Sequence, residues 1–363
     1  MLNKLGNIIN RTLYSVSAFS LRHTIRAKRR KTYNQRKKDM EPLTKTELRS
    51  INRIDIPDYT LFKYMGGADN LSYYVPIARY ITKILPVLNP ENHSPSGASK
   101  DNMFSDKNYA QLYMSGFNFP NTPFRRINGQ FYDSAMHRIS REDVLKLASN
   151  YDELVFKQSV GSSHGKGVRL IQAEGFENAI DSYGKDYLAQ ERIFQHENLA
   201  YFNESSVNIV RITSLFWNGT VYLLSGILRI GAPGSFCDHT PHGGIHNLDI
   251  ALNDDGTFHN TAFDPDHCLI YDNVYGKEIR GFIPNYETMK KLVVQEHSKY
   301  PYYGIIGWDL TVDRNGDIIC VEYNSKFPGI FASQYACGPI FAQKSKDGRP
   351  LLDEIRAKYP SVK

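Results

Sequence analysis

The stretch that decides the fold is residues 307–324, which read GWDLTVDRNGDIICVEYN. Two apolar runs, Gly307–Val312 and Ile318–Tyr323, enclose a polar turn at residues 313–316 (DRNG). Short apolar runs on either side of an Asn-Gly turn are typical of two antiparallel strands joined as a hairpin. The stretch therefore predicts a β-hairpin late in the chain.

Two carboxylates and one amide lie on this hairpin. Asp309 and Glu322 are thirteen residues apart, a spacing that can place them side by side across the two strands. Asn324 follows Glu322 by two residues and so lies on the same strand face. Such a set suits Mg²⁺, which takes its other ligands from water and substrate phosphates. A solvent-facing acidic hairpin is the alternative, but lone carboxylates inside apolar strands are costly.

A glycine-rich segment lies earlier in the chain, where residues 157–168 read KQSVGSSHGKGV. Lys157 ends an apolar run and three glycines follow, so a strand, a loop and a second strand are expected. Glycines let backbone N–H groups approach phosphate oxygens, and lysine supplies positive charge. The segment lacks the GK[ST] ending of a Walker A loop. Taken alone, it is equally well interpreted as a flexible hairpin or as a phosphate-binding loop.

Together the loop and the hairpin resemble the ATP-grasp superfamily, in which a lysine-bearing strand and a glycine-rich loop close over ATP and a late D…ExN set holds magnesium. Within it, the chain is most similar to the sugar-transfer-associated ATP-grasp proteins, which are related to α-L-glutamate ligases. The resemblance extends over residues 100–330. Its motifs are Lys157–Val168, Ser206–Arg211, Leu228–Gly231, Asp238 with Gly243 and Gly244, Gly307–Asp309 and Glu322–Asn324.

The resemblance implies a site for ATP and two Mg²⁺ ions. Lys107 corresponds to the earlier nucleotide-binding lysine and Lys157 to the second. The segment at 189–193 (AQERI) corresponds to the strand end beside adenine, so Gln190 or the backbone after it is expected to read the base, and Glu197 the ribose. The implied metal ligands are Asp309, Glu322 and Asn324. The implied ATP-binding residues are Lys107, Lys157, Ser162, Ser163, His164, Gly165, Gly167, Gln190, Glu191, Ile193 and Glu197.

Two arginines lie in the apolar runs of a second predicted hairpin, at 207–230. A guanidinium fork suits phosphate and carboxylate, so Arg211, Arg229 or both are expected to stabilise the transferring phosphoryl group. Partnership with a buried carboxylate is the alternative. The chain departs from the D-alanine–D-alanine ligases at Gly307, where they carry an arginine, and Arg229 is the expected substitute. Lys326 is expected to contact γ-phosphate or an acidic substrate, or else to be a surface charge.

The segment at 238–246, DHTPHGGIH, contains three histidines. Spacings of three and four residues are compatible with zinc, but a proline and two glycines leave no helix to hold that geometry. The resemblance instead places the glycine pair in a loop near the active site. The expected substrate-binding residues are Asp238, His239, Gly243 and Gly244.

The whole pattern indicates an α+β chain with antiparallel sheets. The resemblance implies the ATP-grasp fold, with two α+β subdomains that close over ATP and, in this chain, a helical basic N-terminal extension. The expected organisation is an extension (1–50), a helical and pre-grasp segment (51–150), a lid subdomain (151–200), a catalytic subdomain with the metal site (201–345) and a C-terminal helix or tail (346–363).

Two helices are expected ahead of the glycine-rich segment. The first covers Tyr73–Leu85 and is expected to end at Pro86, because proline lacks the N–H that a helix interior needs. The second covers Asp106–Ser115.

The chain of 363 residues is 41% hydrophobic and 23% charged, which is ordinary for a globular protein. Its net charge of +6 is unevenly distributed. Residues 1–50 hold 13 of the 44 Lys and Arg but only 3 of the 38 Asp and Glu, so the remainder carries 31 basic and 35 acidic residues, or −4. The basicity is therefore a property of the N-terminal segment.

Apolar residues recur at helical spacing over 2–16, ahead of a basic cluster at 22–31. Such a helix suits peripheral contact with an anionic membrane surface, and packing on the body is an equally good interpretation. A nucleic-acid partner is not expected, because no recognised module surrounds the cluster. Four scattered cysteines and no run of 18 apolar residues predict a cytoplasmic protein, peripheral at the inner face of the membrane.

The expected function is an ATP-dependent carboxylate–amine ligase that forms an amide through an acyl phosphate. The sugar-transfer association implies that it attaches an amino acid to an acidic glycan of a surface polysaccharide, such as a capsule. Two alternatives stay open, an ATP-grasp kinase that phosphorylates a hydroxyl and a non-catalytic nucleotide-binding scaffold. Intact Lys157, Asp309, Glu322 and Asn324 argue against the scaffold, because a decayed site should have lost some of them.

Overall fold

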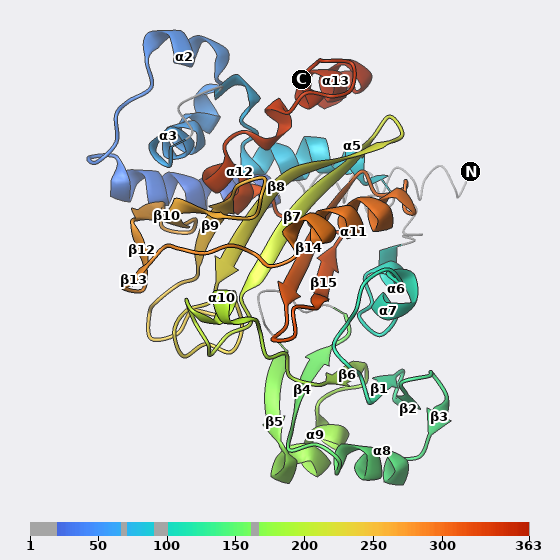
Figure 1. Ribbon diagram of the computed structural model, residues 1–363. Coiled ribbons are helices and arrows are strands. Elements are labelled where there is room, and N and C mark those ends of the chain that lie inside the picture. Colours follow the sequence, from blue (N-terminus) through green and yellow to red (C-terminus); the bar gives the residue numbers. More distant parts are fainter. Residues whose placement is uncertain (1–19, 67–70, 91–100, 161–166, 363) are drawn as a thin grey trace.

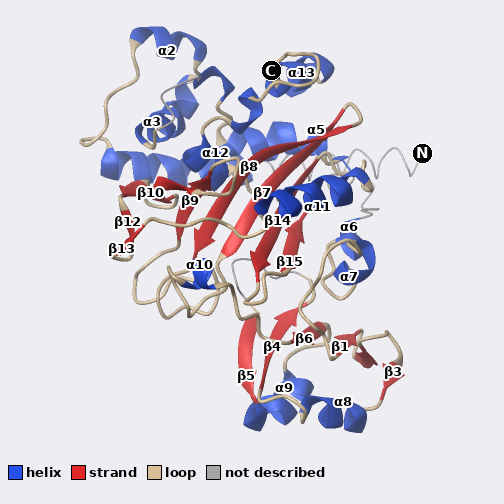
Figure 2. Cartoon of the chain, viewed as in Figure 1, coloured by secondary structure: helices blue, strands red, loops and turns tan. Residues whose placement is uncertain are grey.

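Two antiparallel β-sheets with helices on their faces make up the body of the protein (Figure 1). The structure is a computed structural model and describes residues 20–66, 71–90, 101–160 and 167–362. The large sheet lies at the centre and the small sheet below it, with further helices above (Figure 2). The predicted α+β class with antiparallel sheets is confirmed.

The large sheet has seven strands in the order β11-β10-β9-β8-β7-β14-β15, and every neighbouring pair is antiparallel. Its longest hairpin turns at Asn218 and Gly219, whose φ angles of 47° and 76° are those that a tight hairpin turn requires. The predicted hairpin around 313–316 joins the last two strands. The strands are β7 (Ile209–Trp217), β8 (Thr220–Ile230), β9 (Leu248–Leu252), β10 (Phe258–Asp264), β11 (Leu269–Tyr271), β14 (Ile305–Val312) and β15 (Ile318–Asn324).

The small sheet has six strands in the order β3-β2-β1-β6-β4-β5, again all antiparallel. Two helices, α8 (Arg141–Ala148) and α9 (Phe176–Ser182), cover one face with an apolar core. The sheet takes strands from both sides of residue 150 in the sequence. The strands are β1 (Phe124–Ile127), β2 (Gln130–Asp133), β3 (Arg138–Ile139), β4 (Glu153–Gln158), β5 (Val168–Gln172) and β6 (Tyr187–Gln190).

Side-chain alternation separates the two faces of the large sheet. Ile212 and Trp308 point to the face that α11 (Tyr286–Ser298) covers, where they join the main apolar core. Arg211 and Asp309 are the next residues along the same strands and so point to the opposite face. The sheet therefore presents an apolar face to α11 and carries its charged residues on the other.

The helix predicted to end at Pro86 begins later than expected and continues past the proline. It covers residues 77–88, so the prediction was wrong, and it packs with α13 (Leu351–Lys358) on the large sheet. A π-helical turn at Tyr80–Ile84 lies immediately before the proline. This wider turn relieves the clash between the proline ring and the preceding carbonyl, which would otherwise break the helix.

The helix predicted over Asp106–Ser115 is shorter than expected. Only α7 (Ala110–Tyr113) is helical there. The Asp106 carboxylate accepts a hydrogen bond from the backbone N–H of Asn108 at 2.9 Å. This local bond makes a turn that competes with the helix, as is common for aspartate.

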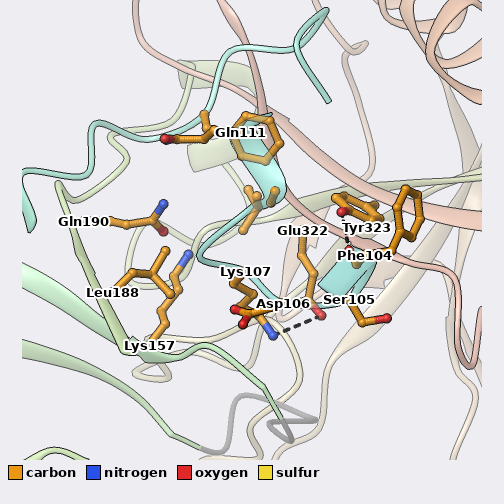
Figure 3. A pocket seen from close by; sticks show the side chains of 13 residues that line it. Phe104, Ser105, Asp106, Lys107, Gln111, Lys157, Leu188, Gln190, Glu322 and Tyr323 are labelled. Atoms are coloured by element: carbon orange, nitrogen blue, oxygen red, sulfur yellow. Dashed lines mark hydrogen bonds and ion pairs between the residues drawn. The ribbon is translucent and has the colours of Figure 1, made fainter. Parts of the chain in front are cut away.

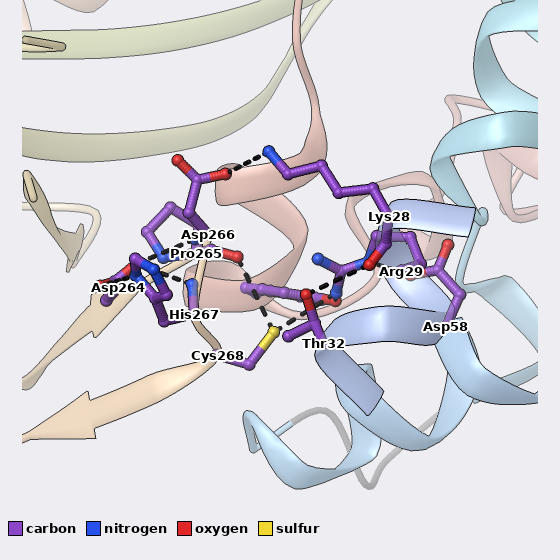
Figure 4. A network of polar contacts seen from close by, with 10 residues as sticks. Lys28, Arg29, Thr32, Asp58, Asp264, Pro265, Asp266, His267 and Cys268 are labelled. Carbon is purple, nitrogen blue, oxygen red and sulfur yellow. Dashed lines mark hydrogen bonds and ion pairs between the residues drawn. The ribbon is translucent and has the colours of Figure 1, made fainter. Parts of the chain in front are cut away.

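The helix of residues 20–36 is packed against the body. Arg29 is buried, and its Nε donates to Asp58 Oδ1 at 3.1 Å while its terminal nitrogen contacts the Tyr335 hydroxyl. Figure 4 shows this network between the helix and the turn after β10. The expected helical basic extension is thus present over 20–36, whereas the apolar segment at 2–16 lies outside the described residues.

Across the described residues, no helix is long and apolar enough to span a membrane. The remaining elements are α2 (Lys45–Ser50), η1 (Arg53–Asp55), α3 (Ile56–Tyr64), η2 (Leu71–Tyr73), α4 (Ile77–Arg79), η3 (Tyr80–Ile84), α5 (Leu85–Leu88), α6 (Asp101–Phe104), η5 (Ala173–Gly175), α10 (Glu197–Ala200), β12 (Asn273–Val274), β13 (Lys277–Glu278), α12 (Phe331–Cys337), η6 (Ile340–Ala342) and η7 (Pro360–Val362).

Candidate active site between the two sheets

A row of charged side chains crosses one face of the large sheet. Asp309 on β14 lies directly opposite Glu322 on β15 and directly opposite Arg211 on β7. Arg229 on β8 lies opposite Asp249 on β9. Opposed residues of antiparallel strands share a face. The predicted juxtaposition of Asp309 and Glu322 is therefore confirmed, and the charged row extends over five strands.

Asp309 is held by a bidentate ion pair. Arg211 donates from Nε to Asp309 Oδ1 and from a terminal nitrogen to Oδ2 at 2.7 Å. The side chains are only 9% and 12% exposed, so water screens the pair little. Asn324 adds a bond from its amide nitrogen to Asp309 Oδ2 at 2.9 Å. The structure thus gives Arg211 a buried carboxylate partner, as the alternative interpretation expected.

Two lysines face Glu322 across the cleft between the sheets. Lys107 Nζ lies 3.6 Å from Glu322 Oε1, and Lys157 enters the same cleft from the end of β4 (Figure 3). Burial lowers the pKa of Lys157 to about 8, and the negative charge of Glu322 opposes that shift. Burial also raises the pKa of Glu322, against the effect of Lys107. Two lysines thus share a poorly solvated space with the carboxylates of Glu322 and Asp106.

The cleft lies at the point where the small sheet meets the end of β15. Its enclosed space is small, about 30 Å³, which is room for one or two water molecules. A nucleotide base therefore needs side chains or the small sheet to move before it can enter. The residues that line the cleft are Phe104, Ser105, Asp106, Lys107, Ala110, Gln111, Phe119, Lys157, Leu188, Gln190, Val321, Glu322 and Tyr323.

Arg229 lies between two carboxylates. Its Nε donates to Asp249 Oδ1 and its terminal nitrogen to Asp238 Oδ2, each at 3.3 Å. Burial raises the pKa of Asp249 to about 6, against the effect of the arginine. Burial likewise raises the pKa of Asp238. Two carboxylates on one guanidinium therefore compensate the positive charge of Arg229 in this arrangement.

The loop that carries Asp238 turns at its glycine pair. Gly243 and Gly244 are exposed and have φ angles of 58° and 80°, within a tight turn closed between His242 and Ile245. His239, beside Asp238, is half-buried. Within the described ranges, no cluster of three or more His, Cys, Asp or Glu side chains could hold a metal ion.

The glycine-rich segment is described only in part. Gly167 precedes β5 with a φ of 72°, and a Cβ there would lie 2.7 Å from Gln158 Oε1, so only glycine fits without displacing that side chain. The Gly167 carbonyl accepts from the Gln158 N–H at 3.0 Å, which closes the base of the loop. Four expected ATP-binding residues lie outside the described ranges: Ser162, Ser163, His164 and Gly165.

Four expected residues lie beyond the lining of the cleft. The Glu191 carboxylate accepts from the Asn121 amide at 2.7 Å, and Ile193 is half-buried on the segment after β6. Glu197 is exposed in the first turn of α10, and Lys326 is exposed in the loop after β15. Gln190, in contrast, is buried and lines the cleft.

Sequence reasoning missed Asp249 and the residues that support Gln190. Asp249 lies in the apolar run LDIAL at 248–252, the same signal of a lone carboxylate in a strand that singled out Asp309. Gln111, in the short helix α7, and Thr122, in an irregular segment, gave no such signal, because polar residues are ordinary in both.

Comparisons with known proteins identify the family. The chain matches the model of the sugar-transfer associated ATP-grasp family over residues 88–347. A search of curated proteins found no match. Similar solved structures include D-alanyl-alanine synthetase A of Vibrio cholerae (10% identity, TM-score 0.44, 73% of this chain and 66% of that chain) and the VanG D-Ala:D-Ser ligase of Enterococcus faecalis (14%, 0.41, 72% and 63%).

A third similar structure is the biotin carboxylase domain of the Hydrogenobacter thermophilus 2-oxoglutarate carboxylase, solved in complex with MgADP and bicarbonate (16% identity, TM-score 0.38, 68% of this chain and 47% of that chain). The chain therefore spans less than two thirds of the length of these three proteins. The family match is more direct, since it covers well over half of the 363 residues. This chain belongs to the sugar-transfer associated ATP-grasp family.

Proposed function

We propose that the protein is an ATP-dependent carboxylate–amine ligase. In this proposal a substrate carboxylate accepts the γ-phosphoryl group of ATP, and an amine then displaces phosphate from the acyl phosphate to form an amide. The observation that carries the proposal is the opposition of Asp309 and Glu322, because Glu322 lines a cleft that also holds Lys107 and Lys157. Carboxylates paired across a cleft with two lysines suit a metal-bound polyphosphate.

The residues present fit Mg²⁺. Asp309, Glu322 and Asn324 offer the hard oxygen donors that Mg²⁺ prefers, and three protein donors leave positions for water and phosphate oxygens. Arg211 and Asn324 use three of the four lone-pair positions of Asp309, so a position remains for a cation. We propose that these three residues hold two Mg²⁺ ions, which would neutralise charge on the phosphates.

The chain's own residues would act by positioning and charge. Lys107 and Lys157 would bind the phosphates. Arg211 would orient Asp309, because both ends of its fork are already bound to that carboxylate. Arg229 would stabilise the transferring group only after one of its carboxylate partners moves away. Lys326 would join them from the loop after β15.

The base and ribose would lie at the other end of the cleft. Gln190 and the backbone at Glu191 and Ile193 would read adenine, and Glu197 would bind the ribose hydroxyls. For the substrates, we propose an acidic sugar of a surface polysaccharide as the carboxylate and an amino acid as the amine, in line with the family's sugar-transfer association. The loop with Asp238, His239, Gly243 and Gly244 would contact them.

A kinase remains the second candidate. The observation that favours it is Gly307, which lies where D-alanine–D-alanine ligases carry an arginine beside the first metal carboxylate. A Cβ at this position would lie 3.2 Å from an Arg211 terminal nitrogen, so a larger side chain would crowd the guanidinium that holds Asp309. Without that arginine, the reaction could stop at phosphoryl transfer to a hydroxyl.

ADP release from purified protein tests the proposal. The protein is supplied with Mg-ATP, uronic acids or acidic glycans, and pooled amino acids. We expect release that requires both a carboxylate and an amine and that disappears in Asp309→Asn and Glu322→Gln. Asp317→Asn, an exposed carboxylate on the same hairpin, is the matched control and should retain activity. Release that needs no amine would favour the kinase, and nucleotide binding without any release would leave the non-catalytic scaffold.

We also propose that the N-terminal segment contacts an anionic membrane surface. A groove runs along the helix of residues 20–36, and its described charged side chains are all basic. The helix residues that line the groove recur in pairs every four residues and so follow one side of the helix. Arg26 is already paired with Asp55, so Arg22, Arg30 and Lys31 are the proposed contacts for phosphate headgroups. The groove is lined by Arg22, His23, Arg26, Ala27, Arg30, Lys31, Asn34, Gln35 and Ile54.

Sedimentation with phosphatidylglycerol vesicles tests this contact. Each basic residue near such a surface contributes about 1 kcal/mol, so replacing Arg22, Arg30 and Lys31 by Gln should weaken binding roughly a hundredfold. Equal binding by the triple variant, or binding to neutral phosphatidylcholine vesicles as well, would contradict the proposal. The matched control replaces three exposed basic residues of the small sheet side, Arg138, Lys146 and Lys185.

A further inference from the structure

A series of hydrogen bonds, called the relay below, runs from buried Arg125 through Gln111 and Thr122 to Gln190 at the cleft. A terminal nitrogen of Arg125 donates to Gln111 Oε1 at 3.2 Å, and Gln111 Nε2 donates to Thr122 Oγ1 at 3.2 Å. Thr122 Oγ1 in turn lies 3.2 Å from Gln190 Nε2. Figure 3 shows the Gln190 amide pointing into the cleft, on the side above Leu188 and Lys157.

The chemistry of these side chains determines which group donates and which accepts in each hydrogen bond of the relay. A guanidinium only donates, so Gln111 must turn its oxygen toward Arg125 and its NH₂ group toward Thr122. The single hydroxyl hydrogen of Thr122 goes to the Pro120 carbonyl at 3.1 Å. The Thr122 oxygen therefore accepts from both Gln111 and Gln190.

Gln190 is consequently held in one orientation. Its NH₂ group faces Thr122 and its amide oxygen is left for the cleft. The reversed amide would need the hydroxyl hydrogen that Pro120 accepts, and so would lose a buried hydrogen bond. Without such partners a glutamine amide reverses easily, because its two ends have nearly the same shape.

Local structure makes the arrangement rigid. Thr122 is buried two residues ahead of β1, and β1 pairs with β6, which ends at Gln190. Arg125 lies on β1 itself and is anchored by the Asn108 carbonyl at 2.7 Å. The backbone N–H of Glu191 also donates to the Asn121 carbonyl at 2.9 Å, which fixes the chain on both sides of the contact.

We infer that this relay makes the nucleotide site selective for adenine over guanine. Adenine carries an amino donor at the ring position where guanine carries a carbonyl acceptor. A fixed amide oxygen in the cleft can accept from adenine, whereas it faces another acceptor in guanine. The inference rests on the proposed nucleotide site. Thr122, Gln111 and Arg125 act through Gln190 and are positioning residues.

The test compares the affinities of the full chain for Mg²⁺ complexes of non-hydrolysable ATP and GTP analogues, measured by titration calorimetry. We expect wild type to prefer the ATP analogue roughly a hundredfold, since sites built on a specific hydrogen bond discriminate strongly. Thr122→Val frees the amide to reverse, so the preference should fall to roughly threefold or less. Thr122→Ser keeps the hydroxyl and should restore the wild-type ratio.

Two substitutions of Gln190 test the role of its amide oxygen directly, with Thr122 left unchanged. Gln190→Glu presents only acceptors and should keep the preference for ATP, whereas Gln190→Met removes the acceptor and should abolish it. Thr60→Val is the matched control, because Thr60 is a buried threonine with one hydroxyl bond far from the cleft. It should leave the ratio unchanged.

The outcomes separate this inference from the proposed function. Equal wild-type affinity for both analogues would overturn the relay while leaving the nucleotide site in place. A folded Thr122→Val with the wild-type ratio, or a Gln190→Met that keeps the ratio, would overturn it as well. Failure of wild type to bind either analogue would remove the proposed function, and this inference with it.

Discussion

Replacing Arg211 by methionine should leave Asp309 buried without its partner. Methionine keeps most of the side-chain volume, so packing changes little, but the positive charge of the guanidinium is lost. Both side chains of the pair are about nine-tenths buried, at 9% and 12% exposure. Removal of one partner from a buried pair costs about 3–5 kcal/mol, most of it from the stranded charge.

The magnitude can be converted into a melting temperature. The unfolding entropy is about 2.1 cal/mol/K per residue. For a chain of 363 residues that unfolds as one unit, this loss of stability lowers the melting temperature by about 4–7 °C. Asp309→Asn also breaks the pair but strands an arginine. If the stranded charge is the cause, the double variant Arg211→Met with Asp309→Asn should be more stable than the sum of the two single losses predicts, by at least about 1 kcal/mol.

Urea unfolding followed by tryptophan fluorescence measures this directly. The chain has two tryptophans, Trp217 and Trp308, and both lie in the large sheet beside the pair's strands. The signal therefore reports the unit that contains the pair. The midpoint should shift to lower urea with little change in slope.

Arg141→Met is the matched control. Arg141 also makes a bidentate pair, with Asp181 at 2.9 Å and 2.7 Å, but that pair is on the surface. We expect little change there, because exposed pairs are screened by solvent. Similar small effects at Arg211 and Arg141, or additive losses in the double variant, would refute the argument that burial makes the Asp309 pair important.

Three further outcomes are expected. The pKa of Lys157 is about 8 in the folded chain, below its unfolded value of 10.5. Between pH 8 and pH 10.5 the unfolded chain therefore holds a proton that the folded chain has released. The free energy of unfolding should rise with pH across that range. Urea unfolding followed by circular dichroism should show this rise weakened in Lys157→Met. Gly167→Ala should lower nucleotide affinity and destabilise the small sheet by about 1–3 kcal/mol, because alanine is strained at a positive φ and its Cβ would clash with Gln158. Gly219→Ala has the same backbone strain without a clash, so it should destabilise the protein less. Arg29→Met should cost about 3–5 kcal/mol and expose the helix of residues 20–36 to limited proteolysis, but Lys28→Met, which loses an exposed pair, should do neither.

The parts of the site that the sequence could predict are those that local spacing controls. A register shift between Asp309 and Leu310 brings Asp309 opposite Glu322, and that shift lies beyond what the turn controls. The hairpin itself follows from the Asn-Gly turn at 313–316. The same holds for the hairpin around Asn218 and Gly219, and for the acidic first turn and Ser N-cap of α8. Each depends on residues that are close in the chain.

Helix boundaries were less predictable, because distant contacts and local turns compete with propensity. Pro86 should have ended its helix, but packing on the large sheet and a π-helical turn carry the helix past it. Asp106 should have begun a helix, but its side chain makes a turn instead. Neither competition can be judged from pattern alone.

Only the tertiary structure decided the partners of the charged residues. Arg211 and Asp309 are 98 residues apart in sequence and meet because β7 pairs with β14. The orientation of Gln190 likewise depends on Thr122, 68 residues earlier. A hairpin forms because of the few residues of its turn. These contacts instead depend on which strands become neighbours, and the burial of the whole core makes that choice.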